Sequence, residues 1–213
     1  MNTNYPPLDC CKFIGTIPIY SHSIKTRRTK ATRMFDLLSP FYDTIVPVIS
    51  RLQSRRVPSI LSEVLTQLDV KREHRLLDVG IGTGINWLYL KPIPRSIVGV
   101  DPSIGMLRRC ARRFQKLGIQ GKLFCHSAEQ LHFGNDEFDR IVCIGVLMYI
   151  TSYHQVLKEM LRVLKPTGKL IIIVSSSWLS QQEKPLFQRM DQEIQITKLT
   201  QGIITVIAIQ YRE

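Results

Sequence analysis

Hydrophobic positions along the chain follow two spacings, one typical of strands and one typical of helices. Five short apolar runs predict buried strands: 75–79, 96–100, 122–125, 138–144 and 169–174. Two segments, 103–117 and 152–165, instead have apolar side chains three and four positions apart, which predicts helices packed on one face. The same spacing recurs between residues 60 and 68. Strands that alternate with helices predict a doubly wound α/β sheet whose strands are mostly parallel.

The end of the chain departs from this alternation. Residues 193–200 and 203–211 are both rich in β-forming side chains, and Gln201-Gly202 separates them. This pattern predicts an antiparallel hairpin that closes the sheet. Residues 175–192 leave room for one short helix between the last parallel strand and the hairpin.

The beginning of the chain differs from the remainder in charge. Residues 1–35 contain six Lys or Arg and a single acid, Asp9, in a chain whose net charge is +12. We therefore divide the chain into a basic, mobile arm (1–35) and one folded domain (36–213). A basic arm suits an anionic membrane surface, and its Arg-rich, acid-poor composition is also typical of organelle-targeting segments. Both alternatives stay open.

Composition excludes several classes of protein. Hydrophobic residues make up 44% of the 213 residues, too many for a disordered or collagen-like chain. No apolar run approaches the roughly 20 residues that a membrane-spanning helix needs. The five cysteines show neither a disulfide framework nor metal-ligand spacing. We therefore expect a cytoplasmic protein, membrane-associated at most through its arm, and no metal site.

The candidate chemistry begins at LDVGIGTG, residues 77–84, where a strand runs into three glycines. Glycine permits a tight turn and lets a ligand approach the backbone closely. The spacing matches neither the G-x-G-x-x-G of dinucleotide sites nor a phosphate P-loop. Asp101 ends the next strand, a place where a carboxylate can accept both hydroxyls of a ribose. This combination favours a ligand that contains a ribose.

Four stretches of the chain, taken in order, resemble a known family. They are LDVGIGTG (77–84), VGVDPSIGML (98–107), SAEQLHF with FDRIV (127–133 and 138–142) and LRVLKPTGKL (161–170). Together they resemble class I S-adenosylmethionine-dependent methyltransferases, the group that includes ubiquinone/menaquinone methyltransferases and small phospholipid N-methyltransferases. The resemblance implies a Rossmann-like sheet, S-adenosyl-L-methionine as cofactor, and methyl transfer as the activity.

The resemblance also implies a role for each position near the glycines. The loop would line the methionine and ribose parts of the cofactor through Gly80, Gly82, Thr83 and Gly84. Asp78 would hold the loop or reach the methionine amino group through water. Asp101 would accept hydrogen bonds from the ribose hydroxyls.

The adenine side of the implied site is less regular. Met106 would lie near the adenine, although its place on a helical stripe suits core packing equally well. Ser127 and Ala128 would meet the adenine edge, and Ile144 would offer backbone to the methionine end. Relatives usually have Gly-Asp-Ala where this chain has His126-Ser-Ala. The usual carboxylate is therefore absent, which leaves weaker binding or a substitute role for Ser127.

The segment FDLLSPFYD, residues 35–43, is similar to an element that precedes the first helix in related enzymes. It would cover the cofactor, so Tyr42 and Asp43 are candidate lid or substrate-facing residues, with a packed aromatic and a helix cap as the alternatives. Tyr149, after the fourth strand, is a third candidate. Methyl transfer needs a base only for some acceptors, and no residue has a context that singles it out. The catalytic residue therefore stays unassigned.

The resemblance favours a small or lipid-like methyl acceptor, of quinone or phospholipid-headgroup type. The short connection 175–192 suits an open pocket, a large or membrane-borne acceptor, or a lid supplied by residues 1–50. The basic charge keeps an RNA-directed enzyme as an alternative, and the altered adenine loop keeps a non-catalytic assembly subunit as another. The sequence does not predict the oligomeric state.

Overall fold

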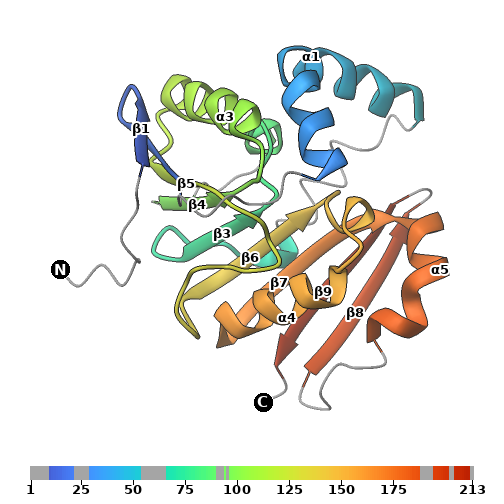
Figure 1. The fold of residues 1–213 in the computed structure, drawn as a ribbon. Helices are drawn as coiled ribbons and strands as arrows, with labels where there is room; N and C mark the ends of the chain where they lie inside the picture. Colours follow the sequence, from blue (N-terminus) through green and yellow to red (C-terminus); the bar gives the residue numbers. More distant parts are fainter. Residues whose placement is uncertain are drawn as a thin grey trace.

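The computed structural model describes residues 10–21, 29–53, 66–89, 94, 96–187, 194–201 and 204–211. Over these ranges the chain forms one mixed sheet with helices on both faces (Figure 1). The strand order is β1-β2-β5-β4-β3-β6-β7-β9-β8. The predicted doubly wound sheet, mostly parallel with a C-terminal antiparallel hairpin, is confirmed.

The elements have the following bounds. The strands are β1 (Cys10–Ile14), β2 (Ile17–Ser21), β3 (Arg75–Val79), β4 (Ser96–Val100), β5 (Gly121–Cys125), β6 (Phe138–Ile144), β7 (Leu164–Ser175), β8 (Ile194–Gln201) and β9 (Ile204–Tyr211). The helices are α1 (Lys30–Gln53), α3 (Ile104–Leu117), α4 (Tyr153–Val163) and α5 (Ser176–Phe187), with two 3₁₀ turns, η1 (Ile85–Leu88) and η2 (Leu147–Tyr149).

The centre of the sheet is parallel. Strands β5, β4, β3, β6 and β7 pair with their neighbours in the same direction, so their carboxyl ends meet at one edge. Strand β3 pairs with β4 on one side and with β6 on the other, which makes it the point where the winding reverses. Ligands of open α/β sheets bind beside such a point, at the carboxyl ends of the strands.

The two faces of the sheet bury separate apolar clusters because successive strand residues point to opposite sides. In β3, Leu76 packs in the cluster that contains Phe114 of α3, whereas Leu77 packs in the cluster that contains Met160 of α4. Helix α3 is capped at both ends: Ser103 Oγ accepts from the backbone N–H of Met106, and the chain leaves the helix at the left-handed Gly118.

The N-terminal residues differ from the predicted mobile arm. Strands β1 and β2 form a hairpin around a two-residue turn with Gly15 at φ +59, and β2 pairs in parallel with β5. Ile17 and Ile19 are buried because the alternation of β2 points both to the α3 face. This apolar alternation outweighs the basic composition of the segment. Residues 1–9 and 22–28 lie outside the described residues.

Two further elements differ from prediction. Helix α4 ends at Val163, and β7 begins at once, whereas the sequence predicted helix to residue 165 and strand from 169. The four residues that carry the proline and glycine, 165–168, form an irregularity in the pairing of β7 with β6. The predicted helix between residues 60 and 68 lies outside the described residues except for a helical end at 66–68. The short helix predicted before the C-terminal hairpin is α5.

Candidate functional site

The glycine-rich loop leaves the carboxyl end of β3 and turns sharply. The N–H groups of Gly80 and Ile81 donate to the carbonyl of Val100, at 2.7 and 3.1 Å, which ties the turn to β4. Gly80 has φ +73, and a Cβ there would lie 2.2 Å from the Val146 side chain. Gly84 has φ +69, and its Cβ would lie 2.8 Å from Cys110 Sγ of α3. The fold itself therefore requires these two glycines.

Gly82, between them, has a different environment. Its φ is +56, and a Cβ there would meet nothing closer than the Gly80 carbonyl oxygen at 3.9 Å. Gly145, which follows the end of β6, is similar: its φ is +69, and no described atom lies within 4 Å of a Cβ there. Both backbones therefore face open space at the same edge of the sheet, which suits close approach of a ligand.

Asp101 joins the loop to the start of α3. Its Oδ2 accepts from the N–H of Gly82 at 3.0 Å, and its Oδ1 accepts from the N–H of Ser103 at 2.8 Å. Burial raises the pKa of Asp101 to about 6, although the two hydrogen bonds act to lower it. The carboxylate thus lies beside the open backbone of Gly82, where the resemblance places a ribose.

Asp78 is the more deeply buried carboxyl group. Its Oδ2 accepts from Trp87 Nε1 at 2.8 Å. Burial is the main reason that the pKa of Asp78 rises to about 7, and the nearby charge of Asp101 adds to the shift. Trp87 could not be predicted as this partner, because a tryptophan in a short turn belongs to no motif that pairs it with a carboxylate.

The residues implied for the adenine side lie on two elements. Met106 is buried in the first turn of α3, and Ala128 is buried after β5. Ile144, implied for the methionine end, is the last residue of β6. The Ser127 hydroxyl donates to the Glu129 carboxylate, whose other oxygen accepts from Ser152 Oγ at 2.9 Å. Glu129 was not among the predicted site residues. Its place two residues after Ser127 is the only sequence feature that indicates a carboxylate beside this loop.

Helix α1 lies over the glycine-rich loop. Asp43 accepts from Thr83 Oγ1 at 2.6 Å through one oxygen and from Arg113 Nη2 at 2.7 Å through the other. Asp36, two turns earlier, accepts from Ser103 Oγ at 2.5 Å and from the N–H of Gly105 at 3.1 Å. The segment 35–43 therefore lies within α1 rather than before the first helix, and its two acids connect α1 to the loop and to α3.

A proline interrupts the hydrogen bonding of α1 at this place. Pro40 has no N–H to donate to the carbonyl of Asp36, four residues earlier. The Ser39 hydroxyl donates to that carbonyl instead, at 3.0 Å. Because the Ser39 hydroxyl replaces the missing N–H, the Asp36 carbonyl keeps a hydrogen-bond donor. The helix therefore continues past Pro40, and Asp43 reaches Thr83.

An aromatic group borders the site. Phe35 packs edge-on against Tyr149, with ring centroids 5.1 Å apart, and against Tyr42, at 6.2 Å. Burial, with smaller contributions from Tyr149 and Asp101, raises the pKa of Tyr42 to about 12. Its hydroxyl therefore stays protonated at neutral pH and can donate a hydrogen bond. Tyr149 is half exposed, so this group presents an aromatic surface beside Asp101.

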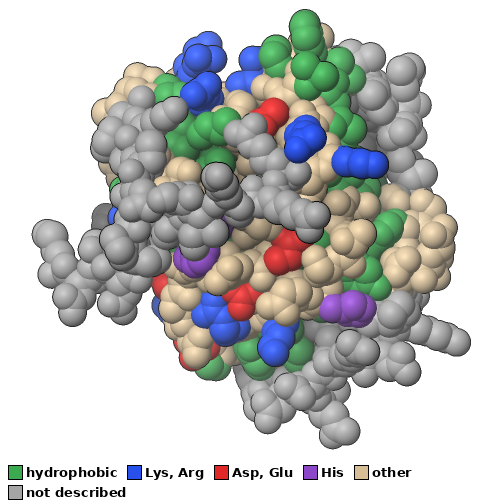
Figure 2. Space-filling view, viewed as in Figure 1, with side chains coloured by type: hydrophobic (Ala, Val, Ile, Leu, Met, Phe, Trp, Pro, Cys, Tyr) green, Lys and Arg blue, Asp and Glu red, His purple; other side chains and the backbone are tan. Residues whose placement is uncertain are grey.

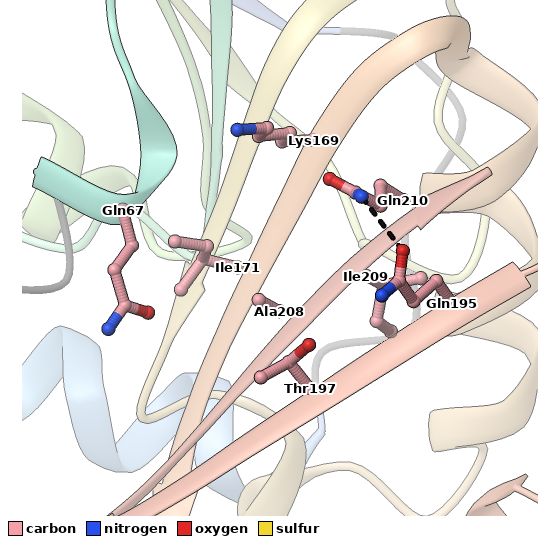
Figure 3. A pocket seen from close by; sticks show the side chains of 8 residues that line it. All are labelled: Gln67, Lys169, Ile171, Gln195, Thr197, Ala208, Ile209 and Gln210. Carbon is pink, nitrogen blue, oxygen red and sulfur yellow. Dashed lines mark hydrogen bonds between the residues drawn. The ribbon is translucent and has the colours of Figure 1, made fainter. Parts of the chain in front are cut away.

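A separate pocket lies at the opposite end of the sheet (Figure 3). It is lined by residues of β7, β8 and β9 and by Gln67 of the helical stretch 66–68. Lys169 lies at the amino end of the regular pairing of β7 with β6. Gln210 Nε2 donates to Gln195 Oε1 there at 3.1 Å. The lining contains neither a carboxylate nor a histidine, so the pocket lacks the groups of the candidate site. Among the described residues, no cluster of His, Cys, Asp or Glu could hold a metal ion.

Comparisons with known proteins agree with this geometry. The family model for a methyltransferase domain matches residues 77–172. The demethylmenaquinone methyltransferase of Paenarthrobacter aurescens (strain TC1) is 32% identical over 150 residues, which are 70% of this chain and 56% of that protein. The chain spans about half the length of the curated relatives it matches.

Two solved structures show the same fold at low identity. A SAM-dependent methyltransferase from Aquifex aeolicus has a TM-score of 0.61 at 18% identity, over 76% of this chain and 96% of that one. The cyclase SpnF has a TM-score of 0.71 at 15% identity, over 87% and 96%. The family implies S-adenosylmethionine as methyl donor, and the open backbone at Gly82 beside Asp101 fits that cofactor. This chain belongs to the class I S-adenosylmethionine-dependent methyltransferase family.

Proposed function

We propose that this protein transfers a methyl group from S-adenosylmethionine to a small or lipid-like acceptor, of quinone or phospholipid-headgroup type. The observation that carries the proposal is the meeting of Gly82 and Asp101 at the point where the sheet reverses its winding. There an open backbone lies against a carboxylate that suits ribose hydroxyls.

Different residues of the site would bind different parts of the cofactor. Asp101 would hold the ribose, and the loop backbone at Gly82 would accommodate the methionine end. Asp78 would bind the methionine amino group, directly or through water. A cation next to this buried carboxyl favours its ionised form, so ligand binding would lower the pKa of Asp78 from about 7. The open backbone of Gly145, after β6, would border the side of the cofactor opposite to Asp101.

The bound cofactor supplies an electrophilic methyl group on a sulfonium that is already a good leaving group. The chain's part is then to orient the acceptor and to exclude water. Helix α1 serves the second purpose because Asp43 holds it against Thr83 of the loop. The protonated hydroxyl of Tyr42 suits hydrogen bonding to an acceptor oxygen, but it does not suit proton removal.

The aromatic group supports a ring-containing acceptor. Phe35, Tyr42 and Tyr149 offer faces and edges that stack on planar rings. A related protein with a quinone precursor in its name, the demethylmenaquinone methyltransferase of Paenarthrobacter aurescens, points to the same acceptor class. A quinone-type ring is therefore the first acceptor to test, and a phospholipid headgroup is the second.

The test uses S-adenosylmethionine with an isotopically labelled methyl group. The full chain is incubated in parallel with a demethylated quinone, with phosphatidylethanolamine vesicles and with RNA, and Asp101→Ala serves as the control. We expect label in the quinone or the lipid, and none with the variant. Label in RNA alone would support an RNA-directed enzyme, and donor binding with no transfer to any acceptor would support a non-catalytic subunit.

A further inference from the structure

Helix α1 has its polar side toward the protein. Thr32 and Ser39 are 5% and 6% exposed, and Asp36 and Asp43 bond to α3 and to the glycine-rich loop. These four residues are spaced by three or four positions, so they form one stripe of the helix. A surface helix of a globular protein normally buries its apolar stripe instead.

The opposite side of α1 is apolar and exposed. We call it the apolar ridge, and it consists of Met34, Leu37, Leu38, Phe41 and Ile45. Leu37 is 77% exposed and Phe41 is 62% exposed. Figure 2 shows hydrophobic side chains gathered over α1 at the top of the molecule, with Lys and Arg side chains close by. A continuous exposed ridge of large apolar side chains indicates a surface that binds an apolar partner.

Basic side chains border the ridge. Lys30 and Arg33 are exposed in the first turns of α1, and Arg108 and Arg112 are exposed on the neighbouring α3. Helix α3 is held against the polar stripe of α1 by the contact of Arg113 with Asp43. Lys and Arg side chains lie beside the exposed hydrophobic side chains on the face seen in Figure 2. An apolar stripe bordered by Lys and Arg is typical of helices that lie in the interface of an anionic membrane.

We propose that the apolar ridge docks on an anionic lipid bilayer, with its side chains in the acyl boundary and the basic border at the phosphates. No helix in the described ranges is long and apolar enough to cross a membrane, and docking of this kind needs none. The same helix contacts Thr83 of the glycine-rich loop. Docking would therefore bring the candidate cofactor site to the bilayer surface, within reach of an acceptor dissolved in it. The docking itself does not rest on methyl transfer.

The test is cosedimentation of the full chain with vesicles of phosphatidylcholine, alone or mixed equally with phosphatidylglycerol. The double variant Leu37→Ser/Phe41→Ser removes apolar side chains that are exposed, so the fold should tolerate it. We expect its partitioning onto mixed vesicles to fall at least tenfold, because each buried apolar side chain contributes about a tenfold factor or more. Leu117→Ser, at the far end of α3 and 42% exposed, is the matched control and should bind like the wild type.

A second pair of variants tests the charge. Arg108→Glu/Arg112→Glu should remove the preference for phosphatidylglycerol, with a loss of about fivefold for each charge. Lys158→Glu, exposed on α4 at the other face of the sheet, is its control. Equal binding of the wild type and Leu37→Ser/Phe41→Ser would overturn the proposal, and so would absence of wild-type binding.

A second copy of the chain is the alternative partner of the apolar ridge. Sedimentation velocity without lipid would reveal this self-association as a dimer that Leu37→Ser/Phe41→Ser dissociates, and this result would overturn membrane docking. Calorimetry with S-adenosylmethionine in the absence of vesicles separates the two proposals. The ridge variant should bind the cofactor like the wild type, so a loss of docking with intact cofactor binding concerns the ridge alone.

Discussion

The buried carboxyl group of Asp78 leads to a sharp prediction about stability. Replacing Asp78 by Asn should make the ligand-free protein more stable at pH 8 and should change its stability little at pH 4. The reason is that burial, together with Asp101, raises the pKa of Asp78 from 3.8 to about 7, against the opposing hydrogen bond from Trp87. Between pH 3.8 and about pH 7, the Asp78 carboxyl group is protonated in the folded protein and ionised in the unfolded chain.

The sign of the effect follows from proton linkage. Stability rises with pH only where the unfolded state binds more protons. Here the folded state binds more, so the contribution of Asp78 falls as the pH rises from about 4 to about 7. A difference of about three pKa units corresponds to about 4 kcal/mol. Asn is neutral at every pH in this range and can still accept from Trp87 Nε1, so Asp78→Asn should gain up to about 4 kcal/mol at pH 8.

The assay is urea denaturation followed by circular dichroism, for wild type and variant, at several values between pH 4 and pH 8. Asp139→Asn is a control with the opposite sign. Burial raises the pKa of Asp139, but hydrogen bonds from Lys165 and from the N–H of Arg75 outweigh it, so the pKa is lowered. The contribution of Asp139 is therefore present above pH 3.8 and is lost as the pH falls below it. Equal or lower stability of Asp78→Asn at pH 8 would refute the reasoning.

Three further variants test the loop and its cover. Gly80→Ala should destabilise the fold by about 2 kcal/mol or more, because the positive φ adds to a clash with Val146, and thermal unfolding measures it. Gly82→Ala should cost only about 1 kcal/mol of stability. It should nevertheless weaken cofactor binding at least tenfold, as measured by calorimetry. Unchanged affinity would contradict the claim that the cofactor lies against the Gly82 backbone. Asp43→Asn should destabilise the protein by about 1–3 kcal/mol through its contacts with Thr83 and Arg113, and a double-mutant cycle with Thr83→Val should show coupling.

Periodicity and glycine spacing were enough to predict the centre of the fold. Strands β3, β4 and β6 lie within the predicted ranges because their apolar runs are continuous, as buried parallel strands require. The loop at 77–84 and Asp101 are joined by a hydrogen bond from Gly82, so the two strongest motifs do meet. Which of the predicted site residues touch the cofactor stays a prediction.

The remainder depended on long-range contacts that spacing does not encode. Nothing in the sequence near Asp36 or Asp43 indicates that they bond to residues some 70 positions away, Gly105 and Arg113. The hairpin of β1 and β2 was missed because its basic neighbours dominated the composition of the segment. Helix α1 itself was not predicted, because residues 35–43 resembled an element that precedes the first helix. Its outward apolar side could not have been predicted either, since an amphipathic pattern does not say which side of a helix faces the protein.

The central claim is that this sheet edge binds S-adenosylmethionine, and titration calorimetry tests it most directly. The full chain is titrated with S-adenosylmethionine, S-adenosylhomocysteine and NADH, beside Asp101→Ala with circular dichroism as a check on its fold. We predict saturable binding of both sulfur ligands, no binding of NADH, and at least tenfold weaker binding by the variant, because charged hydrogen bonds to the ribose are lost. Failure of the folded wild type to bind either sulfur ligand, or equal affinity in Asp101→Ala, would contradict the account.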